Sequence, residues 1–171
     1  GGSTWVTGTY DEDTNTIFWG SGNPGPDWDN EYRPGDNLYS NSALALDADT
    51  GKIKWKFKVN KTKNSLLYAN FFKGSPWGGL SLDTKRGLLF FTTGNPSPWH
   101  TGIFRKGDNL YANSVVAFDL NQKDIKWYFQ EVPHDVWNYD LAAPPILTMV
   151  KREGKYVDVV VSISKLVNLI I

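Results

Sequence analysis

The segment Gly35-Asp36-Asn37-Leu38-Tyr39 recurs as Gly107-Asp108-Asn109-Leu110-Tyr111, at an offset of 72 residues. The repeat extends outward from this segment, because residues 1–58 align with residues 73–130 without a gap. The two copies share 23 identities in 58 positions, far more than chance would give. Self-similarity at a fixed period is the sequence signature of solenoids and propellers. The repeat therefore predicts two copies of one supersecondary unit.

Each copy contains four short runs of β-branched, aromatic or alternating residues, separated by turn residues. In the first copy the predicted strands are Trp5–Tyr10, Thr16–Gly20, Ala43–Asp47 and Ile53–Val59. In the second copy they are Trp77–Leu82, Gly87–Thr92, Ser114–Asp119 and Ile125–Gln130. A further hairpin is predicted over Ile146–Val150 and Tyr156–Ser164, and no helix is expected. Four-stranded units repeated about a centre are propeller blades, so the predicted fold class is all-β, a partial β-propeller of about two and a half blades.

The predicted organisation is a first blade over 1–59, a linker over 60–72, a second blade over 73–145 and the start of a third blade over 146–171. The repeat is longer than the roughly 40–50 residues of a simple blade. The excess lies in the linker and in the long loop over 23–37. Long ordered loops on rigid strands commonly carry function.

Charge and cysteine content exclude several classes of partner and site. Lys and Arg together number 18, as do Asp and Glu, so no nucleic-acid or anionic-membrane surface is expected. There is no cysteine, and hence no disulfide framework and no cysteine-based zinc site. The first residues show neither Met nor a signal peptide, so the chain is expected to be an internal fragment, too short to be a whole enzyme. The apolar run over 157–171 is too short to span a bilayer.

The segment over 45–55 predicts how one blade contacts the next. A strand ends at Asp47, a Thr-Gly-Lys turn follows, and the next strand carries Trp55. Trp55 is predicted to pack between neighbouring blades, where a Trp buries about 150–250 Å². The second copy keeps the corresponding Asp119 and Trp127 but replaces the Thr-Gly turn.

Taken together, these motifs resemble the quinoprotein alcohol dehydrogenases, including the methanol, ethanol and membrane glucose dehydrogenases. The segments that carry the resemblance are Gly2-Ser3-Thr4-Trp5, Trp19–Pro26, Arg33–Tyr39, 45–55, Pro133–Asp140 and Ala143-Pro144-Pro145. The resemblance implies an eight-bladed propeller with pyrroloquinoline quinone (PQQ) and Ca²⁺, or a lanthanide, on its axis. It also implies a small alcohol or sugar as substrate, a cytochrome or quinone as electron acceptor, and a periplasmic location.

The resemblance assigns cofactor and metal roles to one residue pair from each copy. Trp5 and Trp77 match the Trp that stacks beneath PQQ; a core Trp between blades is the alternative. A flat cofactor binds well to an indole face. Asn23 and Asn95 match the Asn whose side-chain oxygen ligates the metal; an ordinary Asn-Pro turn is the alternative. Hard divalent cations prefer oxygen ligands.

The proton acceptor departs from the family pattern. Asn138 stands where the family has the Asp that takes the alcohol proton, and a neutral amide is a poor base. Asp140 matches a second Asp that serves as a metal ligand in the lanthanide branch. Either Asp140 acts as the base in a shifted geometry or the chain is catalytically impaired; a turn cap is a further interpretation of Asp140. Residues 138 and 140 share one side if the segment is extended. His134 and Asp135 are expected to orient this loop.

Two further departures bear on function. The motif block occurs twice, although two identical sites cannot both hold one axial PQQ, and the first copy has Lys61–Asn64 near the place of the His-Asp-x-Trp segment. The family's Glu metal ligand, its PQQ-clamping Arg and its cysteine pair are absent. The leading hypothesis is a dehydrogenase fragment active only within a complete propeller. The alternatives are a non-catalytic scaffold or binding module, or an inactive remnant. The apolar ends of such an arc are expected to bind the remaining blades or to self-associate.

Overall fold

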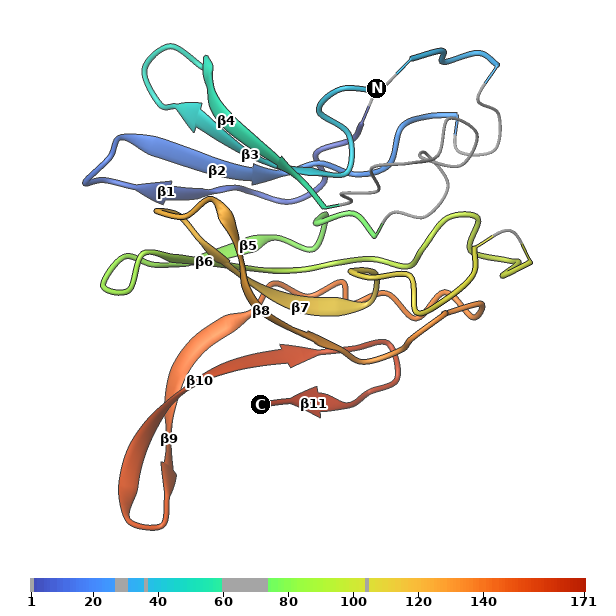
Figure 1. Ribbon diagram of the computed structural model, residues 1–171. Coiled ribbons are helices and arrows are strands. Elements are labelled where there is room, and N and C mark those ends of the chain that lie inside the picture. Colours follow the sequence, from blue (N-terminus) through green and yellow to red (C-terminus); the bar gives the residue numbers. More distant parts are fainter. Residues whose placement is uncertain (1, 27–30, 36, 60–73, 104) are drawn as a thin grey trace.

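The computed structural model describes residues 2–26, 31–35, 37–59, 74–103 and 105–171, which form three antiparallel sheets. The sheets stack one on the next in chain order (Figure 1). The first contains β1 (Thr9–Asp11), β2 (Thr16–Gly20), β3 (Ser42–Asp47) and β4 (Ile53–Lys58). The second contains β5 (Leu80–Asp83), β6 (Leu88–Thr92), β7 (Ser114–Asp119) and β8 (Asp124–Gln130). The third contains β9 (Ile146–Arg152), β10 (Lys155–Ile163) and β11 (Leu169–Ile170).

Within every sheet each strand pairs with its neighbour in the sequence, so each sheet is a simple meander. The described residues include no helix, and accordingly none that is long and apolar enough to cross a membrane. The predicted all-β, partial-propeller fold is confirmed. The predicted linker over 60–72, including Lys61–Asn64, lies outside the described residues. The blade boundaries stay a prediction.

The sequence repeat is also a repeat of backbone geometry. The N–H of Asn41 donates to the carbonyl of Gly22, and the N–H of Asn113 donates to the carbonyl of Gly94, both at 3.0 Å. Each pair ties the start of the third strand of a sheet to the loop that follows its second strand. Those loops, and the segment after β8, leave the sheets on one side of the molecule (Figure 1).

Two strand predictions need correction, and one short strand was not predicted. β1 begins at Thr9 and β5 at Leu80, so Trp5 and Trp77 precede their strands instead of starting them. In the second copy the left-handed backbone of Gly79 (φ 97°) interrupts an extended run ahead of β5. The short strand β11 was not expected, because two residues are too few to show a period.

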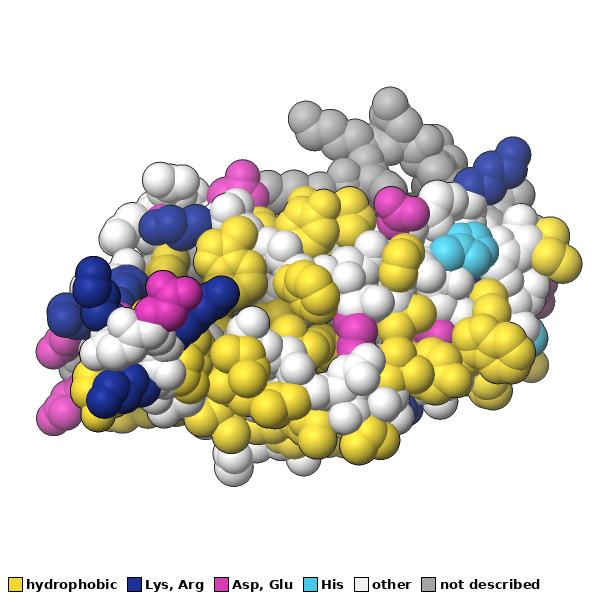
Figure 2. Space-filling view, turned by 90° about the horizontal axis from the view of Figure 1, so that it is seen from below, with side chains coloured by type: hydrophobic (Ala, Val, Ile, Leu, Met, Phe, Trp, Pro, Cys, Tyr) yellow, Lys and Arg dark blue, Asp and Glu magenta, His cyan; other side chains and the backbone are white. Residues whose placement is uncertain are grey.

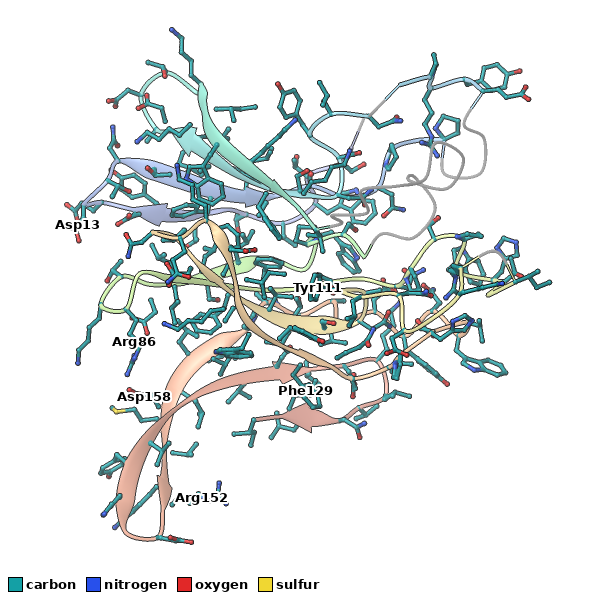
Figure 3. All side chains as sticks on the ribbon, in the orientation of Figure 1. Asp13, Arg86, Tyr111, Phe129, Arg152 and Asp158 are labelled. Carbon is teal, nitrogen blue, oxygen red and sulfur yellow. The ribbon has the colours of Figure 1, made fainter. Side chains whose placement is uncertain are left out.

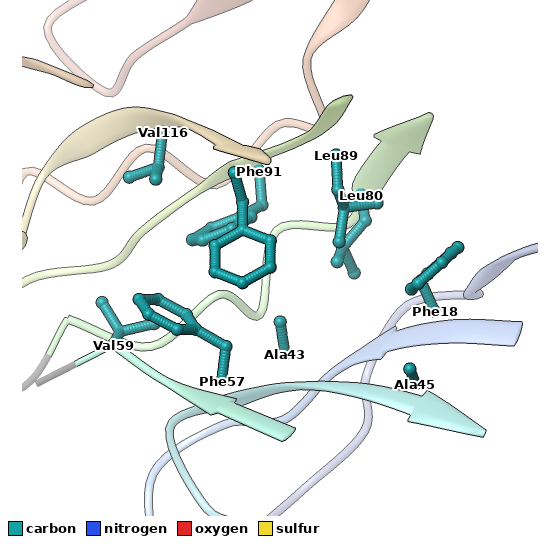
Figure 4. Packing of buried hydrophobic residues seen from close by; sticks show 10 residues of the cluster. Phe18, Ala43, Ala45, Phe57, Val59, Leu80, Leu89, Phe91 and Val116 are labelled. Atoms are coloured by element: carbon teal, nitrogen blue, oxygen red, sulfur yellow. The ribbon is translucent and has the colours of Figure 1, made fainter. Parts of the chain in front are cut away.

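The main apolar core lies between the first and second sheets (Figure 4). Trp55 confirms the predicted docking role, since its ring centroid lies 5.7 Å from that of Phe18 and 5.5 Å from that of Phe118 in the second sheet. β6 and β7 are buried along their whole length because they are covered on both faces, which explains their nearly continuous apolar sequence. The buried cluster comprises Phe18, Ala43, Ala45, Phe57, Val59, Leu80, Leu89, Phe91, Val116 and Phe118.

The second and third sheets share a smaller contact. Leu88, Phe90 and Ala117 are buried there, with Leu147 and Val160 packed against them. An ionic contact adds to it, since Arg86 binds Asp83 at 2.7 Å and also reaches Asp158 on β10 (Figure 3). These carboxylates raise the pKa of Arg86, the hydrogen bond to Asp83 contributing most.

Several apolar side chains of the third sheet are exposed. Its hairpin, β9 and β10, extends away from the other sheets (Figure 1). Apolar side chains gather on the face seen from below (Figure 2). Ile146, Val157 and Ile163 are 62%, 43% and 50% exposed, and the register of β9 with β10 places them on one face of the sheet. Contiguous apolar surface of this kind commonly marks an interaction site.

Candidate functional site

A pocket of about 210 Å³ lies where the long loops of the two repeats meet the segment over 138–140. All six residues that the sequence analysis assigned to cofactor, metal or proton acceptor line this pocket. Both copies of the motif therefore face one cavity, which removes the difficulty of two separate sites. The described residues that line the pocket are Trp5, Asn23, Trp77, Asn95, Ser97, Trp99, Asn138 and Asp140.

Indole rings make up much of the pocket wall. The rings of Trp5 and Trp77 meet edge to face, with centroids 5.4 Å apart and planes at 72°. Trp5 is 61% exposed, so a large part of its ring is open to a ligand. Trp99, which the motif comparison did not single out, contributes a third indole. Such a wall suits a flat conjugated ring.

Asp140 brings the buried negative charge of the pocket. Asp140 is 3% exposed; its Oδ1 accepts the backbone N–H of Asn95 at 2.8 Å, and its Oδ2 lies 2.5 Å from Nζ of Lys165. The N–H that Asp140 accepts belongs to another loop, so this contact joins two segments and is not a cap of its own turn. Lys165 also donates to the carbonyl of Asn138 at 3.0 Å. The turn between β10 and β11 therefore supplies a cation to this pocket.

Sequence reasoning missed Lys165. The available signal was that Lys165 is a single cation within the largely apolar run over 157–171. A buried charge in such a run needs a partner. Ser97 and Trp99 were missed as well, although both follow Asn95 in the same loop. Proximity to a predicted ligand was the only signal for them.

Gly94 allows an indole and a carboxylate to converge. A Cβ at this position would lie 2.5 Å from Oδ1 of Asp140 and 2.6 Å from Nε1 of Trp77, both far inside contact distance. The matching Gly22 is less crowded, because its nearest atom is the carbonyl oxygen of Ser3 at 3.3 Å. The second copy thus requires glycine for close approach much more strictly than the first.

The segment around Asn138 is not extended, which corrects the expectation for residues 138 and 140. Asn138 has a left-handed backbone (φ 64°), a conformation that Asn tolerates better than most residues. Asn138 and Asp140 nonetheless both line the pocket. Alternation in an extended strand predicted that residues 138 and 140 share one side. They do face the same pocket, but a turn at Asn138 places them there.

Comparison with known proteins places the chain in a family. Residues 1–65 and 60–170 match the family described as PQQ, glucose/ethanol/alcohol dehydrogenase, β-propeller domain. The chain belongs to this quinoprotein dehydrogenase family. It is 55% identical over 83 residues to the quinoprotein alcohol dehydrogenase PedH of Pseudomonas putida, a match covering 48% of this chain and 14% of PedH. It is 32% identical over 132 residues to the quinohemoprotein alcohol dehydrogenase of Comamonas testosteroni, covering 65% of this chain and 19% of that enzyme.

Solved structures of quinoproteins share the fold. The crystal structure of the Comamonas testosteroni quinohemoprotein alcohol dehydrogenase matches with a TM-score of 0.69 and 24% identity, covering 92% of this chain and 25% of that one. A europium-containing methanol dehydrogenase matches with a TM-score of 0.66 and 18% identity, covering 88% of this chain and 28% of that one. The matched regions of this quinoprotein chain therefore span between 14% and 28% of the length of these relatives.

The donor atoms in the quinoprotein pocket suit a hard cation. Among the described residues no three His, Cys, Asp or Glu side chains cluster as a metal site would require. The side-chain oxygen donors among the described lining residues are instead one carboxylate, Asp140, the hydroxyl of Ser97, and the amides of Asn23, Asn95 and Asn138. Carboxylate and amide oxygens are what Ca²⁺ and similar ions take. Oδ1 of Asn23 already accepts a hydrogen bond from Ser75 at 3.2 Å, so its position is held.

Proposed function

We propose that this chain supplies part of the cofactor and metal site of a quinoprotein dehydrogenase that oxidises a primary alcohol or a sugar. The supporting observation is the single pocket that gathers motif residues from both repeats with a buried carboxylate. The chain's family membership agrees with this proposal. The isolated chain covers only part of a propeller, so we do not expect it to oxidise substrate without the remaining blades.

Trp77 and Trp5 would hold PQQ through their indole rings, and Asn95, Asn23 and Asp140 would supply oxygen atoms to Ca²⁺ or a lanthanide. When bound, PQQ provides the hydride acceptor and the metal polarises it as a Lewis acid. The indoles keep water from one face of the pocket, and the edge-to-face contact of Trp5 and Trp77 supports their ring orientations.

Asp140 is the residue that we assign as proton acceptor for the substrate hydroxyl. It carries the only carboxylate among the pocket-lining residues that the structure describes. Asn138 cannot take the proton, and its amide instead offers hydrogen bonds that orient a hydroxyl. Lys165 balances the charge of Asp140 in the buried site, where an unpaired carboxylate would be costly.

A non-catalytic scaffold or binding module is the second candidate. Two observations favour it: Asn138 occupies the family's base position, and both oxygens of Asp140 are already engaged, by Asn95 and Lys165. In that case the pocket would bind a ligand without transferring a proton. An inactive remnant would do neither.

Partners and location follow from the same proposal. The remaining blades would cover the apolar face of the third sheet, which is otherwise a site for self-association. A cytochrome or quinone would accept the electrons, since two of the relatives are named quinohemoproteins. The periplasm would be the compartment.

The test is a titration with PQQ in the presence of Ca²⁺, followed by Trp fluorescence. The proposal expects saturable quenching that is lost in Trp77→Ala and in Asn95→Ala. Trp127→Ala is the matched control, because Trp127 lies outside the pocket. Quenching that survives Trp77→Ala and Asn95→Ala, or no quenching at all, would contradict the proposal. Oxidation of a small alcohol by a completed propeller would separate the enzyme from the scaffold.

A further inference from the structure

Arg105 is a fully buried cation next to the pocket but not in its wall. It is 0% exposed and lies in the loop between β6 and β7. Burial lowers the pKa of Arg105, and the charge of Asp135 partly offsets that effect. A guanidinium removed from water needs an acceptor for most of its donors. The groups that accept its hydrogen bonds show which parts of the chain it connects.

One side of the guanidinium holds a pocket loop. Nε of Arg105 donates to the carbonyl of Pro98 at 3.1 Å and to that of Thr101 at 3.0 Å. Pro98 lies between Ser97 and Trp99, which both line the pocket. Nη1 also donates to the side chain of Asn109, 2.5 Å away, in the same loop. This side of Arg105 therefore fixes the wall that carries Ser97 and Trp99.

The other side of the guanidinium holds the opposite wall. Nη2 of Arg105 donates to the backbone carbonyl of Asp135, which is itself 1% exposed. The carboxylate of Asp135 accepts the backbone N–H of Trp137 at 2.7 Å and that of Tyr139 at 2.8 Å. The carboxylate of Asp135 therefore fixes the backbone on both sides of Asn138, at Trp137 and at Tyr139.

We propose that Arg105 is a positioning residue that sets the wall of Ser97 and Trp99 against the wall of Asn138 and Asp140. Its link to the second wall runs through Asp135. Only the expected effect of Arg105 on metal binding rests on the proposed function, because that effect requires the pocket to bind a metal ion. The connection between the two walls is a feature of the hydrogen bonds themselves.

The first repeat provides an internal contrast. Arg33 occupies the matching position, and its Nε donates to the carbonyl of Pro26 at 2.8 Å, as Arg105 does to Pro98. Asp135 lies beyond the aligned repeat, which ends at residue 130, so no residue of the aligned first copy matches it. The Arg–Pro contact is therefore common to both copies, and in the second copy Arg105 also binds Asp135 across the pocket.

Lysine cannot replace this arginine. A guanidinium presents a planar fork of donors, whereas an ammonium is a single point charge on a flexible stem. Arg105→Lys keeps the charge but loses the simultaneous contacts with Pro98 and Asp135. Arg33→Lys makes the same chemical change at the matching Arg–Pro contact of the first copy.

The first test measures the distance between the two walls directly, in the full-length protein. Ile103 and Trp137 are 79% and 72% exposed and lie in the two connected segments, so Cys at both positions can carry spin labels. This chain contributes no other cysteine to be labelled. Electron–electron resonance should give a narrow distance distribution, which Arg105→Lys broadens and Arg33→Lys leaves unchanged. An unchanged distribution in Arg105→Lys would overturn the proposal.

The second test measures binding of Tb³⁺, excited through the pocket indoles. Residues that orient ligands typically change metal affinity by about tenfold or more, so we expect that loss in Arg105→Lys and in Asp135→Asn but not in Arg33→Lys. Asp135→Asn keeps the carbonyl that Arg105 binds, and it decides the matter if Arg105→Lys fails to fold. If Arg105→Lys and Asp135→Asn lower the melting temperature but bind Tb³⁺ as tightly as the parent, then both residues have only a structural role. If the parent protein binds no Tb³⁺, the proposed metal site fails, while the spin-label distances still decide the role of Arg105.

Discussion

Lys165, in the turn between β10 and β11, places its ammonium 2.5 Å from Oδ2 of Asp140 and so neutralises the buried carboxylate of the pocket. The side chain of Asp140 is 5% exposed, whereas that of Lys165 is 41% exposed. The carboxylate is thus the buried partner, and the lysine is the partner that can withdraw into water.

Lys165→Met should raise the affinity of the pocket for cations. Removing a positive charge next to a metal-binding carboxylate favours a bound cation by an amount that grows with the ion's charge, on the order of tenfold for a divalent ion. Isothermal titration with Ca²⁺ and with Tb³⁺ should therefore show the larger gain for Tb³⁺. Without metal the variant should melt earlier, because Asp140 is left buried and unpaired. Equal affinities in variant and parent would show that Lys165 and the ion do not share Asp140.

Gly94→Ala should damage the pocket more than Gly22→Ala. The added methyl of Gly94→Ala must displace Asp140 or Trp77, at a cost of about 1–3 kcal/mol for an overpacked site. Gly22 has room for a smaller adjustment, so its variant is the matched control. The free energy of unfolding in urea and the PQQ-dependent quenching of Trp fluorescence should both decrease in Gly94→Ala and not in Gly22→Ala. Similar losses in the two variants would mean that the crowding at Gly94 has no special role.

Asn138→Asp tests the position of the proton acceptor. Asp tolerates a left-handed backbone nearly as well as Asn, so the fold should be preserved. A second carboxylate in the pocket wall should strengthen Ca²⁺ binding. In a completed propeller the alcohol oxidation rate should rise if residue 138 has the geometry of a base. No gain in rate would mean that Asp140 serves as base or that the site does not turn over.

Trp55→Ala should destabilise the chain more than Trp127→Ala. Trp55 joins the first two sheets through Phe18 and Phe118, and truncating a packed Trp costs about 3–5 kcal/mol. Trp127 contacts Phe90 of its own sheet and is 40% exposed, so its truncation should cost clearly less. The measurement is the free energy of unfolding in urea. Equal losses would show that Trp55 does not bind the two sheets together.

The fold class and six residues of the pocket could be predicted from the sequence. The repeat, the alternation of residue types and the motifs are patterns that can be read along the chain. It could not show that both copies face one cavity, since an offset along the chain says nothing about how two units are rotated in space. Trp5 and Trp77 were assigned to strands because aromatic residues favour strands. They lie in loops, so the pocket context outweighed that preference. Lys165 escaped notice because its partner is 25 residues away and in a different unit.

The meander topology has a consequence for the history of such chains. Every strand pairs only with its neighbours in the sequence, so no pairing crosses from one sheet to another. A stretch of gene that encodes one sheet can be copied, inserted or exchanged without breaking a strand pairing, provided that its flat apolar faces still fit the neighbours. The 72-residue repeat is what such a modular event would leave behind. New binding sites can then arise at the seam, where a copied loop meets the loop from which it was copied.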